Sequence, residues 1–161
     1  MIALRLPTVS FGAVSAIVTS VGLIIGFGAA GISKPTIIAG LLIVGLADNL
    51  SDSLSIHIYQ ESEKLEEHSA FRSTLGNFVT RFIISMSFVI FVLSLLSRNT
   101  VLVSLAWGVS LLIGLTWLVA NSRGANVTAE ILKHLAAAAV VVALSRVVGI
   151  FIGTYVQLFI Q

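Results

Sequence analysis

Apolar residues follow one another along this chain in five long runs, separated by short polar or charged segments. The first run, from Leu6 to Ser33, contains no charged residue and is longer than the roughly 20 helical residues that cross a bilayer core. The same criterion predicts helices over residues 8–32, 36–69, 78–97, 101–121 and 130–160, the second with a charged extension. Pro35 suits the first turn of the second helix, where its missing N–H is not needed. The pattern predicts an all-α membrane protein of five transmembrane helices in one domain, residues 1–161.

The composition agrees with a polytopic membrane protein. Hydrophobic residues make up 57% of the chain and charged residues 10%, and the mean hydropathy is +1.08. The formal charge of +2 comes from scattered basic residues, which argues against a nucleic-acid partner. The sequence has no cysteine, and its predicted spans contain no His pair and no His-Glu helix motif. We therefore predict neither an enzyme nor a permanently bound cofactor.

Basic residues are distributed unequally between the two ends of the predicted spans. With the N-terminus in the cytoplasm, six of them lie on the cytoplasmic side, and Lys34 and Arg98 lie outside. The six are Arg5, Lys64, Arg72, Arg81, Arg123 and Lys133. Five spans then place the C-terminus on the opposite side. The protein is expected in the plasma membrane of a prokaryote or an organelle membrane of a eukaryote.

A polar stripe runs along the second predicted helix. At 100° per residue, Asp48, Asp52, Ser55, Tyr59 and Glu66 fall within a narrow arc. A carboxylate at the centre of a bilayer costs about 3 kcal/mol or more unless it faces water, protein or an ion. Asp48 and Asp52 are therefore the first candidates for function. The alternative is structural, because either acid could form an ion pair with Arg146 of the last helix and only fix the helix packing.

Carboxylates are ligands that divalent first-row cations accept, and a dry environment strengthens their attraction for such an ion. A carboxylate that loses its cation there is expected to bind a proton instead. Ser15, Ser55 and Tyr59 could add oxygen ligands along the path, although serines often bond to their own helix backbone. A second candidate metal cluster lies in the charged extension and consists of Glu63, Glu66, Glu67 and His68. Its alternative is a solvated helix face.

Small residues mark two helices for close packing. Gly22 and Gly26 form a GxxxG pair in the first helix, and Gly149 and Gly153 form another in the last. The sequence leaves open whether the first pair serves a contact within the chain or a dimer interface.

Several segments resemble the vacuolar iron transporter family, whose members are five-span exporters of ferrous iron and related divalent ions. The likeness is strongest in Ala39-Gly-Leu-Leu-Ile-Val-Gly-Leu-Ala-Asp48 followed by Ser53-Leu-Ser-Ile56, which is similar to a family pattern with an acid before Ala-Leu-Ser-Met. The first helix from Phe11 to Ala30 and the Leu144-Ser-Arg-Val-Val-Gly149 segment resemble the family's first and fifth spans. Asp48 falls where the family has a transport Glu, whereas Ser15 and Ile56 replace a family Asp and Met.

The resemblance implies a homodimer with an ion path between the protomers, lined by the first two helices, and transport coupled to protons. The expected function is export of divalent metal ions, iron or manganese, as substrates. The rival expectation is a membrane scaffold that keeps the transporter fold without transport.

Overall fold

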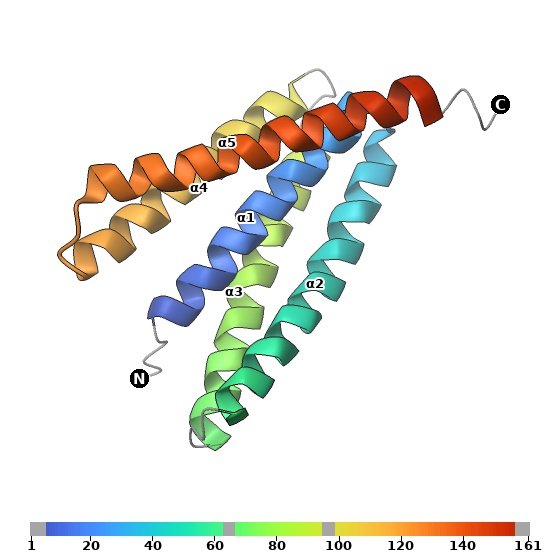
Figure 1. The fold of residues 1–161 in the computed structure, drawn as a ribbon. Helices are drawn as coiled ribbons and strands as arrows, with labels where there is room; N and C mark the ends of the chain where they lie inside the picture. Colours follow the sequence, from blue (N-terminus) through green and yellow to red (C-terminus); the bar gives the residue numbers. More distant parts are fainter. Residues whose placement is uncertain (1–5, 63–66, 95–98, 157–161) are drawn as a thin grey trace.

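The computed structural model describes residues 6–62, 67–94 and 99–156, and Figure 1 shows them as a set of long helices. The helices are α1 (Leu6–Ala29), α2 (Lys34–Ser62), α3 (Glu67–Ser94), α4 (Thr100–Ser122) and α5 (Val127–Phe151), and a π-helical turn, Ile152–Val156, continues α5. Each of the five α-helices is long and apolar enough to cross a membrane. The prediction of a five-helix, multi-pass membrane protein is confirmed, while the orientation of the termini and the homodimer stay predictions.

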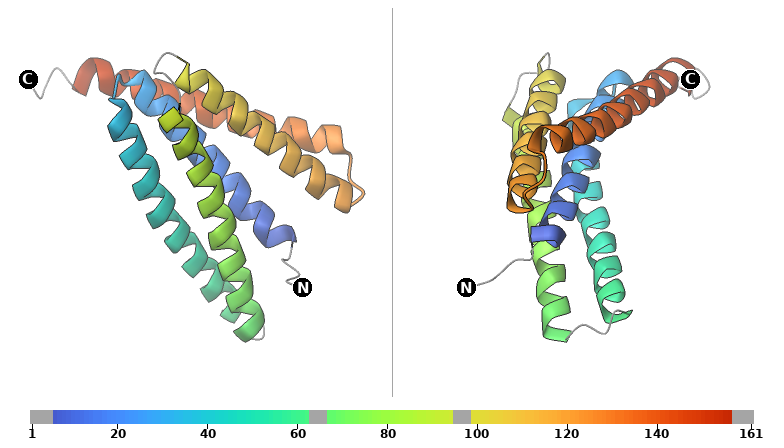
Figure 2. Two further views of the ribbon diagram at one scale, coloured as in Figure 1. Left: turned by 180° about the vertical axis from the view of Figure 1, so that it is seen from behind. Right: turned by 60° about the vertical axis from the view of Figure 1, so that its left-hand side comes forward.

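Helix α1 is the centre of the arrangement, because it packs against all four other α-helices. The α2–α3 pair lies on one side of it and the α4–α5 pair on the other, and the two pairs diverge from a common end (Figures 1 and 2). The core follows this arrangement, with Ile17, Val21 and Ile24 of α1 packed among Leu41 of α2 and Phe88 of α3. Helix α5 contributes little to it, since most of its side chains remain exposed.

The glycines of α1 and α5 meet within one chain. A Cβ added to Gly149 would lie 3.0 Å or less from the backbone oxygen and carbon of Gly26, and one added to Gly153 would lie 3.0 Å from the backbone oxygen of Ala30. Gly22 and Gly26 face Ser145 of α5. The close-packing motif of the sequence is therefore an intramolecular contact between α1 and α5.

The turn between α1 and α2 agrees with its sequence signals. Gly31 has a φ of 71°, which favours glycine, and Pro35 lies in the first turn of α2.

The connection between α2 and α3 was predicted wrongly. The apolar runs predicted helices over residues 36–69 and 78–97, but α2 is Lys34–Ser62 and α3 already begins at Glu67. The polar residues of this segment pack against α2, as the hydrogen bond of 2.8 Å from Gln60 Nε2 to Ser73 Oγ shows. The first part of α3 therefore packs on α2 through a polar contact, which a count of apolar residues does not reveal.

Candidate functional site

Three polar side chains of α2 converge on one arginine of α3. The Arg81 guanidinium donates from Nη2 to Asp48 Oδ2 at 2.6 Å and from Nε to Asn49 Oδ1 at 2.8 Å. Its Nη1 forms an ion pair with Asp52 Oδ2. Asp48 and Asp52 are one helical turn apart, so both carboxylates reach the same guanidinium. We call Asp48, Asn49, Asp52 and Arg81 the arginine cluster.

Arg81 is fully buried, with no exposed surface, and it lies in a polar layer of an otherwise apolar bundle. Asn77 and Ser85 stand one turn before and after it on α3, and Ser53 is buried on α2. Within the described ranges 6–62, 67–94 and 99–156, Asn49 Nδ2, Ser53 Oγ and both amide atoms of Asn77 have no hydrogen-bond partner. Burying polar groups in an apolar bundle costs free energy, so this layer is an unusual part of the fold.

Helix α1 approaches the arginine cluster closely enough to require glycine. A Cβ at Gly12 would overlap the side chain of Asn77 and lie 2.9 Å from Cγ of Arg81. The backbone of α1 thus covers the cluster on one side and keeps Arg81 out of contact with the surroundings.

The two carboxylates, in contrast, are only partly covered. The side chain of Asp48 is 39% exposed and that of Asp52 is 32% exposed, on the edge of α2. Asp48 also lines a small cavity with Thr19, Ser20 and Ser85. Its volume of about 10 Å³ is of the order that one water molecule needs. Each carboxylate is therefore bound to Arg81 on one side and exposed at the surface of the α2–α3 pair on the other.

The ion-pair partner predicted from the sequence was wrong. Arg146 is exposed on α5, and the guanidinium that binds Asp48 and Asp52 belongs to Arg81. The helix predicted over residues 78–97 puts Arg81 near its start, but α3 begins 14 residues before Arg81, roughly 21 Å away along the axis. At that depth the side chain binds the acids of the neighbouring helix. The missed signal was the spacing of Asn77, Arg81 and Ser85, which places polar groups on one face of an apolar helix.

No known protein family, curated protein or solved structure matches this chain. The site is therefore interpreted from its own geometry.

The remaining predicted path residues are dispersed. Ser55 donates to the backbone oxygen of Ser51 at 2.9 Å, as serines in helices often do, and Tyr59 is 64% exposed. Ser15 lines a different cavity, between α1 and the α4–α5 pair. The structure thus brings Asp48 and Asp52 together and leaves the three hydroxyl residues outside the arginine cluster.

The predicted second metal cluster falls mostly outside what the structure describes. Glu63 and Glu66 lie outside the described residues, and Glu67 and His68 are in the first turn of α3 without described side chains. Within the part of the chain that is described, no group of three or more His, Asp or Glu side chains could hold a metal ion. The metal role of these four residues stays a prediction.

Proposed function

We propose that this chain moves divalent metal ions, iron or manganese, out of the cytoplasm in exchange for protons, and that Asp48 and Asp52 bind the ion. The observation that carries the proposal is a pair of carboxylates, one turn apart in the middle of α2, that share a single buried guanidinium. Two negative charges against one positive charge leave the arginine cluster with a formal charge of −1. That excess attracts a further cation, and the low dielectric of the bundle strengthens the attraction.

Arg81 acts in this proposal as a cation that belongs to the protein and competes with the substrate. A divalent ion carries twice its charge, and carboxylate oxygens suit iron and manganese. When the ion leaves, the guanidinium and a proton neutralise the two acids again. Exchange of metal for protons then follows from competition for the same oxygen atoms.

The open sides of Asp48 and Asp52 support a homodimer. Carboxylates that are about a third exposed on a membrane-spanning helix would face lipid in a single copy, at a high free-energy cost. A second copy placed against the α2 edge covers them and encloses a path between the protomers.

One observation favours the rival function, a membrane scaffold. Arg81 already satisfies one oxygen of each acid and ties α2 to α3, as a purely structural ion pair would. The scaffold predicts that the acids matter for folding and that no ion moves.

Transport into proteoliposomes loaded with a metal-sensitive dye separates the two functions. We expect Asp48→Asn and Asp52→Asn, which keep the side-chain shape, each to lower the initial rate of metal uptake at least about tenfold. Glu61→Gln is the matched control, because Glu61 is another acid of α2 but contacts His57, at 3.4 Å, outside the arginine cluster. We expect its rate to equal that of the unmodified chain. Transport would be contradicted if the unmodified chain gave no metal-driven dye signal. It would also be contradicted if the signal were equal in the unmodified chain and its three variants.

A further inference from the structure

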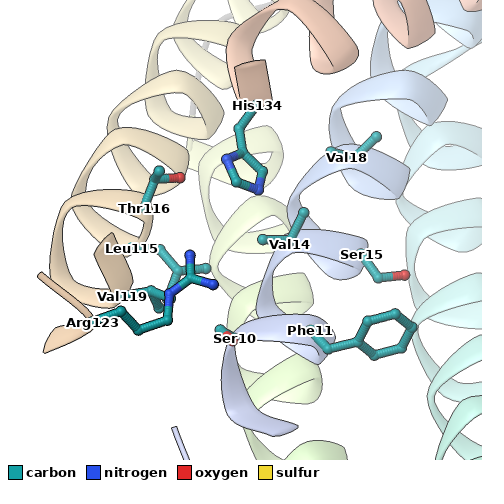
Figure 3. A pocket seen from close by; sticks show the side chains of 10 residues that line it. All are labelled: Ser10, Phe11, Val14, Ser15, Val18, Leu115, Thr116, Val119, Arg123 and His134. Atoms are coloured by element: carbon teal, nitrogen blue, oxygen red, sulfur yellow. The ribbon is translucent and has the colours of Figure 1, made fainter. Parts of the chain in front are cut away.

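A second polar region lies on the side of α1 opposite to the arginine cluster. A cavity of about 500 Å³ opens between the first half of α1, the end of α4 and the start of α5. Figure 3 shows Arg123 and His134 at this cavity, with Thr116 on the α4 wall and Val14 on the α1 wall. Its volume is within the range of small-molecule sites, roughly 300–1,000 Å³.

The polar lining is graded with depth. Arg123 follows directly after the membrane-spanning part of α4, whereas Thr116 and His134 lie roughly 10 Å further in, on α4 and α5. Thr116 is 4% exposed, and its hydroxyl has no hydrogen-bond partner in the described part of the chain. That hydroxyl is enclosed by the protein, so Arg123, whose side chain is 60% exposed, is the polar group available to a ligand.

A second cavity continues along the same three helices. It has a volume of about 280 Å³ and is lined by apolar residues of α1, α4 and α5, among them Leu105, Leu112, Leu135 and Val142. Val18 lines both cavities, so they are neighbours along α1. Together the two cavities have a charged end, at Arg123, at the level of the membrane surface and an apolar end within the bilayer.

The charged side chains around Arg123 carry a net positive charge. Glu130 is the nearby acid, and it is shared between Lys133, whose Nζ lies at 3.0 Å, and Arg123, whose Nη2 lies at 3.9 Å. Two cations against one carboxylate leave a formal charge of +1. His134 Nδ1 is 2.8 Å from the backbone oxygen of Glu130 and donates to it, so Nε2 of the neutral ring is an acceptor and Arg123 is the donor for an anion.

We propose that these neighbouring cavities bind one anionic phospholipid, with its phosphate at Arg123 and one acyl chain in the apolar cavity. Basic pockets between transmembrane helices are sites where acidic lipid headgroups bind. Here the guanidinium of Arg123 supplies the charge and the hydrogen bonds, and the apolar cavity between α1, α4 and α5 holds the chain. The site is separate from Asp48 and Asp52 and does not depend on transport.

Lipid binding to the full chain in detergent tests the proposal by native mass spectrometry. Phosphatidylglycerol, phosphatidylcholine and inorganic phosphate are titrated separately. We expect one phosphatidylglycerol to bind at least about tenfold more tightly than phosphatidylcholine, because both lipids carry the phosphate but the choline ammonium of phosphatidylcholine cancels its charge and is repelled by Arg123. Inorganic phosphate alone is expected to bind weakly. Equal affinity for the two lipids, or phosphate binding as tight as that of phosphatidylglycerol, would overturn the proposal.

Two variants locate the lipid, and one serves as control. Arg123→Gln removes the cation at the cavity, and Ala139→Phe fills the apolar part that Ala139 lines. Each is expected to weaken phosphatidylglycerol binding about tenfold. Arg146→Gln removes the same charge from an exposed residue of α5 that lines neither cavity, and we expect less than about a threefold change. Equal losses for Arg123→Gln and Arg146→Gln would show attraction by surface charge alone and would refute the site.

Discussion

The contact between α1 and α5 gives the sharpest stability prediction, through the substitution Gly149→Ala. An added methyl group would lie under 3.0 Å from the backbone oxygen of Gly26 and 2.9 Å from Cβ of Ala29. Neither atom belongs to a flexible side chain, so the two helices would have to separate by about 1 Å. Overpacking of this kind costs about 1–3 kcal/mol. Helix propensity acts in the other direction, since Ala in a helix interior is more favourable than Gly by about 1 kcal/mol.

Gly114→Ala measures that propensity term by itself. Gly114 lies inside α4 and a Cβ there would meet no atom within 4 Å. Unfolding of both variants in mixed micelles, followed by circular dichroism, should show Gly149→Ala to be less stable than Gly114→Ala by about 1–3 kcal/mol. If the two variants unfold at the same denaturant concentration, the close approach of α1 and α5 is not as described.

Two further substitutions test the arginine cluster and the start of α5. Arg81→Met leaves the carboxylates of Asp48 and Asp52 without their cation and should lower the free energy of unfolding by about 3–5 kcal/mol. Adding Asp48→Asn and Asp52→Asn should recover part of that loss, and a triple variant no more stable than Arg81→Met would contradict the charge argument. Asn126 caps α5 by accepting a hydrogen bond of 3.1 Å from the backbone N–H of Ala129. Asn126→Ala should therefore lower stability by about 1 kcal/mol in the same unfolding assay, and Asn126→Asp should not.

Much of the fold follows from the sequence because a bilayer imposes a length and a polarity on each helix. The five spans and the turn at Pro35 are local properties, and the apolar runs reveal them. The start of α3 at Glu67 was missed because a polar helix that packs on α2 has the same composition as a loop.

The sequence predicts which acids share a face in the candidate site but not which cation they bind. The spacing of Asp48 and Asp52 places both acids on one face of α2 from helical geometry alone. Which cation meets that face depends on which helix packs there. Helix α3 lies beside α2, so Arg81 reaches the acids, whereas Arg146 is on α5, which lies beside α1. Periodicity gives the face of a helix but not its neighbour.

The intramolecular use of the glycine pairs has a consequence for assembly. Gly26 and Gly149 are already occupied by each other's helices, so they are not free to join two copies of the chain. Association between copies has to use a different surface, and α2 offers one edge that carries the exposed ring of Tyr59 and the uncovered sides of Asp48 and Asp52. Two chains that met there would shield each other's negative charges from the lipid tails, and stability, assembly and ion passage would then rest on the same few side chains.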